Sequence, residues 1–196
     1  MDAKINQIGT YHLADNPHLY ELQRNNTFTF IVTGIDNLLK AGTQANDSNN
    51  YITNAADVLR LSVSQSSIPM FTQETITVRR GNSVMKFAGV PSFSDGSITV
   101  NDYIGADSKS ALMAWQNLSY DVATEKVGLA KDYKKTCYLC EYTPDFNKLV
   151  RTWKMLGCFV SGLSEEPFNA EDGSSKKQIT ATISFDKAFM EVPEEE

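Results

Sequence analysis

The chain has 196 residues, of which 41% are hydrophobic and 21% charged, and these values predict one globular domain rather than a disordered chain. Its 24 Asp and Glu residues outnumber its 18 Lys and Arg residues, which gives a net charge of -6. This balance disfavours a nucleic-acid-binding domain, because such domains gain affinity by placing cations on phosphates. No apolar run approaches the ~18 residues of a membrane helix, and the start does not resemble a signal peptide, so neither feature is expected.

The first segment, residues 1–26, is polar and irregular and contains the breaker pair Asn16-Pro17. Its scattered apolar side chains predict an N-terminal arm, which either docks on a neighbouring subunit or is a loosely ordered terminus. Alternating β-branched and aromatic residues at 27–33 then predict a strand that ends at Gly34.

Residues 35–57 are predicted to form an inserted loop region. A short helix can begin at Ile35, but the run of Gly, Thr, Asn, Asp and Ser at 41–50 is typical of a surface loop. Because long loops in compact domains are often functional, this one either reaches an adjacent subunit or ring, or is a tolerated surface insertion.

Two strands with one apolar and one polar face are predicted next. They span residues 57–67 and 74–79, and their apolar positions are Leu59, Leu61, Val63, Ile76 and Val78. A turn at 80–83 leads into a further strand at 84–87. Such strands suit a sheet that has one face on its own core and the other face on water.

Residues 97–103 predict another strand, after which the hydrophobic period changes. Asp107 or Ser108 can cap a single helix over 109–118 that covers one end or flank of the sheet. The side chains on one face of this helix predict packing against the core, and they are Ala111, Leu112, Trp115 and Leu118. A loop or loose hairpin is expected at 121–131.

From Tyr133 onwards, short alternating segments predict strands at 136–142, 148–161 and 179–186, followed by an acidic tail at 191–196. Trp153 lies in one of these patterned strands, which predicts that its side chain packs in the core. The lysines of the 133–135 segment are expected to form salt bridges within or between subunits rather than a nucleic-acid patch.

The sequence predicts no catalytic, cofactor-binding or metal site, and hence no enzyme activity. Cys137 and Cys140 match C-x-x-C, but residues three apart in a strand point to opposite faces, so buried free thiols are expected. The histidines His12 and His18 have no cluster of partners nearby in sequence. Neither a phosphate-binding loop nor a nucleophile motif is present.

The order of these elements resembles the tail tube protein of contractile-tailed bacteriophages. The shared features are a Tyr-Lys-Lys entry into a strand, a hairpin return ending in Leu-Gly before an aromatic residue, a loop, and a Thr-rich last strand closing on Asp. In this chain they start at Tyr133, Leu156, Ser164 and Ile179. Further counterparts at Ser67-Ile68-Pro69, at 75–82 and in the helix around Trp115 extend the resemblance over roughly residues 59–189. The segment 35–57 and the long N-terminus depart from the family pattern.

The resemblance implies a mainly β fold, a two-sheet sandwich or small barrel over residues 27–190, whose strands join across subunits into a ring-shaped barrel. Six copies would form a ring, and rings would stack into the inner tail tube of a virion made in the host cytoplasm. Implied partners are the tail sheath, baseplate and tail terminator proteins. The lumen would hold the tape-measure protein and then conduct double-stranded DNA. An acidic wall would repel the phosphates, so the DNA would pass without binding to it. The implied lumen-facing residues are Arg60, Ser62, Ser64, Thr75, Thr77 and Arg79; an ordinary solvent face is the alternative for each.

Three other functions stay open at this point. One is the inner tube of a tailocin, an extracellular injection system or a secretion system, which shares the fold but passes no genome. Another is a baseplate or terminator ring protein of the same fold. The third is a monomeric carbohydrate-binding β-sandwich, which the patterned positions of Trp115 and Trp153 disfavour because a stacking platform needs exposed rings.

Overall fold

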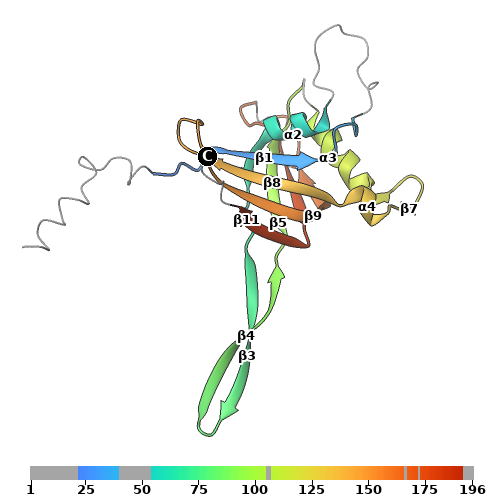
Figure 1. The fold of residues 1–196 in the computed structure, drawn as a ribbon. Helices are drawn as coiled ribbons and strands as arrows, with labels where there is room; N and C mark the ends of the chain where they lie inside the picture. Colours follow the sequence, from blue (N-terminus) through green and yellow to red (C-terminus); the bar gives the residue numbers. More distant parts are fainter. Residues whose placement is uncertain (1–21, 40–53, 105–106, 166, 172, 192–196) are drawn as a thin grey trace, which may run out of the picture.

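The computed structural model describes residues 22–39, 54–104, 107–165, 167–171 and 173–191, which form a body and a long two-stranded projection (Figure 1). The predicted mainly β fold is confirmed, since antiparallel strands dominate and the helices among the described residues are short. None of these helices has the length and apolarity needed to cross a membrane.

Seven strands of the body form one bent antiparallel sheet in the order β1-β8-β9-β10-β5-β2, with β11 also paired to β9. The strands are β1 (Phe28–Thr33), β2 (Val63–Ser66), β5 (Gly96–Asn101), β8 (Lys135–Tyr142), β9 (Leu149–Glu165), β10 (Gln178–Ser184) and β11 (Lys187–Glu191). Strand β9 belongs to both parts of the sheet, because it pairs with β8 and β11 over its first part and with β10 from Phe159 onwards. We call β1, β8, β11 and the first part of β9 the front half, and the remaining strands the back half.

The bend between the halves lies at Gly157 and Asp186, which face each other across β9 and the junction of β10 with β11. Gly157 has a φ of 71°, a conformation that glycine adopts without strain. The Asp186 amide donates to the Leu156 carbonyl at 3.0 Å, and the Asp186 carboxylate pairs with Lys134 at 2.7 Å. The strand from 187 to 191 was not predicted from the sequence.

The core lies between the two halves and follows the alternation of the strands. In β10 the side chains of Ile179, Ala181 and Ile183 are buried, and they join one cluster with Phe30 and Leu139 of the front half. Side chains of successive strand residues point to opposite faces. The polar residues between the buried ones therefore form the outer face of the back half.

Three helices lie beside the sheet in the described part of the chain, rather than the single helix that was predicted. They are α2 (Ala55–Ser62), α3 (Ser108–Asn117) and α4 (Ala130–Tyr133). The helix predicted at 109–118 is confirmed as α3, and its cap is Asp107, whose Oδ1 accepts from the Ser110 amide at 2.8 Å. Helix α2 contacts β1 and α3, and α3 contacts β9.

The strand predicted over 57–67 is wrong for most of its length, because residues 55–62 form α2 and only β2 follows as a strand. The side chain of Asn54 caps α2 by accepting from the amides of Ala56 and Asp57. The buried residues Ala55, Val58, Leu59 and Ser62 follow the helical spacing, whereas Leu61 of the proposed alternation is 59% exposed. The helical period therefore accounts for this segment better than a period of two.

The remaining expectations fall partly inside the described residues. Of the proposed loop region, residues 40–53 lie outside them, Ile35 is buried in a turn rather than opening a helix, and Ala55 to Asp57 belong to α2. The N-terminal segment up to residue 21 and the tail from 192 also lie outside. The loose hairpin expected at 121–131 is confirmed, with β6 (Tyr120–Asp121) paired to β7 (Lys126–Val127).

Strands β3 (Phe71–Arg80) and β4 (Ser83–Phe93) form the projection, which we call the β-ribbon. The predicted turn between them is confirmed, and Gly81 within it has a φ of 63°. The prediction that residues 74–79 are half-buried is wrong, because every residue of β3 is exposed. The β-ribbon continues the β2–β5 pair outward from the body, and beyond its base, where Phe93 packs against Phe185, nothing in the described chain covers either of its faces (Figure 1).

Candidate assembly surfaces

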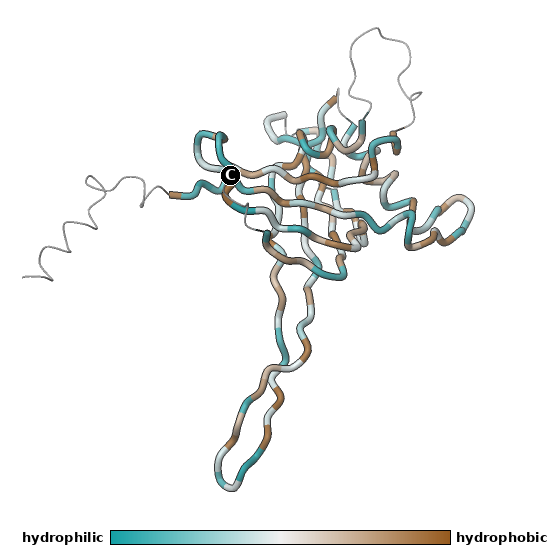
Figure 2. Tube along the Cα trace, viewed as in Figure 1, coloured by the Kyte–Doolittle hydropathy of each residue, from teal (hydrophilic) through white to brown (hydrophobic). Residues whose placement is uncertain are grey.

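Apolar and polar residues alternate along both strands of the β-ribbon (Figure 2), so it has one apolar and one polar face. Residues directly opposite in the register share a face, so Ile76 lies beside Phe87 and Val78 lies beside Met85. These four side chains are 43–54% exposed. A two-stranded ribbon alone has no second layer on which to bury them, and it is marginally stable in water without one.

The opposite face of the β-ribbon is polar and basic. It presents Thr75, Thr77, Arg79 and Lys86, with Val84 directly opposite Arg79. Arg80, at the tip and on the face of Ile76 and Val78, adds a third cation to residues 71–93, which contain Glu74 as the one carboxylate. Since the whole chain carries a net charge of -6, the β-ribbon is a basic extension of an acidic protein.

Aromatic rings anchor the base of the β-ribbon to the body. The ring of Phe93 lies 5.9 Å from that of Phe71 and 5.8 Å from that of Phe185, which is itself buried in the core. Further out, a register shift lies beside Gly89, where an added Cβ would come within 2.7 Å of the Glu74 carbonyl oxygen. Close backbone approach at such a bulge explains why glycine occupies this position.

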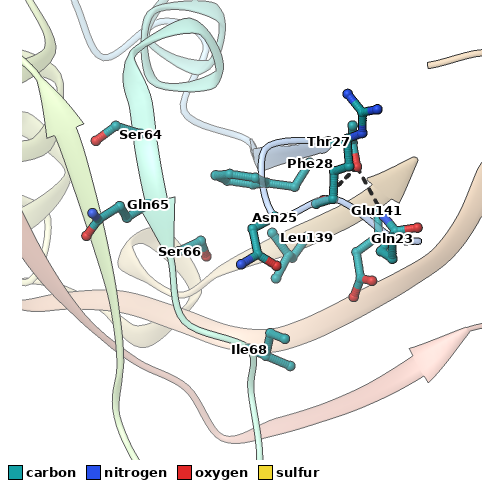
Figure 3. A pocket seen from close by; sticks show the side chains of 11 residues that line it. Gln23, Asn25, Thr27, Phe28, Ser64, Gln65, Ser66, Ile68, Leu139 and Glu141 are labelled. Atoms are coloured by element: carbon teal, nitrogen blue, oxygen red, sulfur yellow. Dashed lines mark hydrogen bonds between the residues drawn. The ribbon is translucent and has the colours of Figure 1, made fainter. Parts of the chain in front are cut away.

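A cavity of about 360 Å³ lies between β1, β2 and β8 (Figure 3). Phe28 and Leu139 line it from the front half and Ile68 from the chain after β2. Gln23 closes one side, where its side-chain amide donates to Thr27 at 3.1 Å and to the Tyr142 carbonyl at 2.8 Å. In the described residues β1 pairs only with β8, and β2 only with β5, so this cavity separates two edge strands. Edge strands with free backbone groups are where a strand from another chain can pair.

Over most of its length the outer face of the back half is polar and uncharged. At its end near the bend, Phe159 lies opposite Ser184, with its ring 5.5 Å from that of Tyr133. Three rows of side chains cross its strands: Gly162, Thr182 and Ser97; Ser164, Thr180, Thr99 and Gln65; and Gln178, Asn101 and Ser64. Thr99 and Thr180 share a hydrogen bond at 3.3 Å, and Gln178 donates to Asn101 at 3.1 Å. The hydroxyl and amide groups therefore partly satisfy one another.

The outer face of the front half differs, because it carries charges and aromatic rings. Lys154 lies beside Tyr138 and Phe189, with its ammonium nitrogen 5.8 Å from each ring centre, and reaches Glu191 at 3.4 Å. Arg151 and Glu141, which pair at 2.9 Å, lie on the opposite face of these strands, because Glu141 alternates in phase with the buried Cys137 and Leu139. The outer faces of the two halves thus present different chemistry to solvent.

The six residues proposed to face a lumen lie in three places. Arg60 and Ser62 are in α2, where Arg60 pairs with Asp57 at 3.2 Å and Ser62 is fully buried. Ser64 lies in β2 and donates to the Thr99 carbonyl at 3.1 Å. The others, Thr75, Thr77 and Arg79, share the polar face of the β-ribbon.

The residues proposed for core packing lie in or against the core. Leu112 and Trp115 are fully buried, while Leu118 and Trp153 are partly buried and pack against the core cluster. The indole nitrogen of Trp115 donates to the Tyr133 carbonyl, and that of Trp153 donates to the Glu141 carboxylate. Neither ring is free to act as a stacking platform.

Lys134, in the segment expected to form salt bridges, pairs with Asp186, whose hydrogen bond raises the pKa of the lysine above its ordinary value. The three cysteines are free and buried. Burial also raises the pKa of the Cys137 thiol well above its usual range, with Cys158 as its hydrogen-bonding neighbour. The described residues contain no cluster of three His, Cys, Asp or Glu side chains able to hold a metal ion.

Solved structures of contractile injection systems and of a tail tube share this architecture. A chain of the sheath–tube complex of PVC, an extracellular contractile injection system, matches with a TM-score of 0.61 at 15% identity, covering 93% of this chain and 99% of that chain. A chain of the tube-terminating cap of the anti-feeding prophage gives 0.59 at 13% identity, covering 88% and 92%. The SPP1 tail tube gives 0.50 at 6% identity, covering 88% and 80%.

The chain has the contractile-system tube fold. The resemblance to tail tube proteins is thus confirmed at the level of the fold, and the two matches cover 93% and 88% of this chain. No protein-family model matches the sequence, and no curated relative matches it. At these identities the likeness is carried by structure rather than by conserved sequence.

Within the tube fold, two surfaces went unrecognised in the sequence. The projection of the β-ribbon has no local signal, because its alternation is the same as that of a half-buried strand. The uncharged outer face did have a signal, since Ser97, Thr99 and Asn101 alternate with apolar residues in one predicted strand, as Thr180, Thr182 and Ser184 do in another.

Proposed function

We propose that this protein is the structural subunit of the inner tube of a contractile tail or injection system, and that its rings stack into a hollow tube. The observation that carries the proposal is the β-ribbon: a tube-fold chain extends an amphipathic pair of strands that it does not cover itself. In the assembly, the apolar face of each β-ribbon packs on a neighbouring copy. The resemblance supports six copies per ring.

The energetics of the β-ribbon favour assembly through many weak contacts. Ile76, Val78, Met85 and Phe87 are each about half exposed, so covering them contributes roughly 1 kcal/mol apiece. A few kcal/mol per β-ribbon does not hold two copies together against the entropy lost on association. In a ring or stack, every copy both gives and receives a β-ribbon, so the contacts add up over the whole assembly.

Charge supports the same arrangement. The β-ribbon carries Arg79, Arg80 and Lys86, whereas the rest of the chain is acidic, so a β-ribbon approaching another copy meets charge of the opposite sign. Such complementarity speeds association and weakens as salt screens the charges, with a screening length of about 10 Å at 0.1 M. Assembly is therefore expected to slow as salt is raised.

The partners follow from the tube role. A tail sheath outside the tube, a baseplate at one end and a terminator at the other are proposed, and the comparison chains from sheath–tube and tube-cap complexes support this set. In a phage tail the lumen would hold a tape-measure protein and then conduct double-stranded DNA from the virion. A baseplate or terminator ring of the same fold would be present in far fewer copies than a tube subunit.

The tube belongs either to a phage tail or to an extracellular injection system. The PVC match has a higher TM-score than the SPP1 match, which favours the injection system. The two candidates differ in what passes through the tube. Nuclease-resistant double-stranded DNA in purified native particles would identify a phage tail attached to a genome, and particles without it but with a protein cargo would identify an injection system.

Electron microscopy of the purified chain over a concentration series, with light scattering for mass, tests the tube role. Wild-type protein is expected to form rings or hollow tubes. Val78→Asn, on the apolar face of the β-ribbon, is expected to abolish them, whereas Val84→Asn, the same change on the polar face, should leave them intact. Wild-type particles that stay monomeric at every concentration, even with seeds of native particles, would contradict the proposal, as would equal assembly of both variants.

A further inference from the structure

The outer face of the back half presents uncharged polar side chains across all four of its strands. The Ser164 row crosses all four strands of this half with a serine, two threonines and a glutamine, and the two flanking rows add glycine, hydroxyl and amide side chains. At the bend the face ends at Phe159, whose ring packs against that of Tyr133. Glu165, a carboxylate at its border, is held by Lys109 near the start of α3 and by Lys177. No ionised group therefore stands free within this face.

We propose that this face is the wall of the channel in the assembled tube, and that it passes an extended polymer without regard to the sign of the polymer's charge. The inference rests on the proposed tube function and deepens it by naming the lumen surface. It replaces the picture of an acidic lumen that repels phosphates. It also places the lumen on the back half of the sheet rather than on the residues of α2.

The chemistry of the face explains why it suits a conduit. A wall of Lys or Arg would hold DNA through phosphate contacts and release counterions at each one, which makes a passing strand adhere. A wall of carboxylates would hold a basic protein instead. Exposed aromatic rings would stack on bases. Serine, threonine and glutamine offer hydrogen bonds that water replaces at little cost, so contacts with the passenger stay weak.

The connection to the β-ribbon places this face in the assembly. Strands β2 and β5 carry the face, and the same two strands run on into β3 and β4. A neighbouring copy that covers the apolar face of the β-ribbon therefore lies in line with the back half. The uncharged face, which has little apolar area to bury, remains open to water.

Thiol labelling tests the wall directly in the full chain. Ser97→Cys and Ser164→Cys place a thiol at two exposed positions on opposite sides of the face with little change in volume. Wild-type protein is the matched control, because its three thiols are buried. Each variant is reacted with a small maleimide and with a maleimide on a bulky polymer, in assembled tubes and in dissociated subunits.

In dissociated subunits both reagents are expected to label both variants. In tubes that microscopy shows to be intact, the small reagent should still label them and the bulky reagent should not. Labelling of intact tubes by the bulky reagent would place the face on the outside of the tube. Failure of both reagents to label intact tubes would place the face in a contact between copies. Either result overturns the inference while leaving the tube role standing. Absence of tubes would overturn the tube role itself, and the inference with it.

A charge substitution tests the neutrality of the wall. Short double-stranded DNA is expected not to sediment with wild-type tubes at low salt. Ser97→Lys should make tubes retain the duplex and release it when salt is raised. Retention by wild-type tubes, or no gain from Ser97→Lys in tubes of normal appearance, would contradict the proposed wall.

Discussion

The body and the β-ribbon of this chain are built from the same kind of antiparallel strands, yet they differ completely in burial. In the body, Ile98 and Val100 of β5 are 1% and 0% exposed, because α2 contacts β5 and both residues join the core cluster with side chains of the front half. In the β-ribbon, Ile76 and Val78 alternate in the same way and are 54% and 47% exposed. The alternation specifies an apolar face in both regions, but the layer that covers it belongs to the same chain in one region only.

This difference separates folding from assembly. Substitutions in the body are expected to change the free energy of unfolding of a single subunit, whereas substitutions in the β-ribbon are expected to change association and leave the subunit's own stability nearly constant. The experiments below test that separation, from the largest expected effect to the smallest.

Loss of a core aromatic ring should have the largest effect. Trp115→Ala removes a fully buried ring whose indole nitrogen also donates to the Tyr133 carbonyl. The free energy of unfolding of the subunit is therefore expected to fall by about 3–5 kcal/mol. Phe87→Ala removes a half-exposed ring from the β-ribbon and should change subunit stability by no more than about 0.5 kcal/mol. Urea denaturation of dissociated subunits measures both, and similar losses for the two variants would contradict the separation.

A pair of glycines with positive φ gives a smaller, matched comparison. Gly157→Ala in the body strains the backbone and brings a Cβ within 2.1 Å of the Asp186 carboxylate, so a loss of at least about 1–2 kcal/mol is expected. Gly81→Ala, at the tip of the β-ribbon, has a similar φ and no atom within 4 Å. Its strain falls on a turn outside the body, and the urea midpoint of the subunit should stay nearly unchanged. A larger loss for Gly81→Ala would show that the β-ribbon folds together with the body.

The smallest effect concerns the ion pair between α3 and β9 in the body. The hydrogen bond from Lys109 lowers the pKa of Glu165, and Lys177 adds to the effect. A carboxyl whose pKa is lower in the folded state stabilises that state above the unfolded pKa, and this contribution is lost as pH falls through the folded value. Wild-type thermal stability should therefore drop slightly more than that of Lys109→Gln as pH falls below about 4.5. Parallel melting curves down to pH 3 would contradict this assignment.

Sequence alone predicted the regular parts of the body, and the reasons are visible in particular residues. Strands β1, β5, β8 and β10 alternate cleanly, and α3 combines a helical period with an Asp107 cap. Helix α2 was predicted as a strand because eight residues fit both periods, and the cap at Asn54 was the signal that decides between them. Strand β11 is short, and its three apolar residues are consecutive, so it shows no alternation.

The assembly surfaces were less predictable, since a sequence reports which face of a strand is apolar but not what covers it. The β-ribbon was therefore expected to pack on its own core. The three residues Thr75, Thr77 and Arg79 share a polar face as predicted, but that face lies on the projection and not on the sheet of the body. Which copy of the chain supplies the missing layer is a property of the assembly, and no local pattern encodes it.

Hydrogen exchange of the backbone amides, compared between dissociated subunits and assembled tubes, tests the central claim most directly. Amides of β3 and β4 are expected to exchange fast in the subunit, because an uncovered two-stranded ribbon opens readily, and to become protected in the tube. Amides of β8 and β9 should be protected in both states. Protection of the β-ribbon already in the subunit, or fast exchange that persists in the tube, would contradict the claim that a neighbouring copy completes this part of the fold.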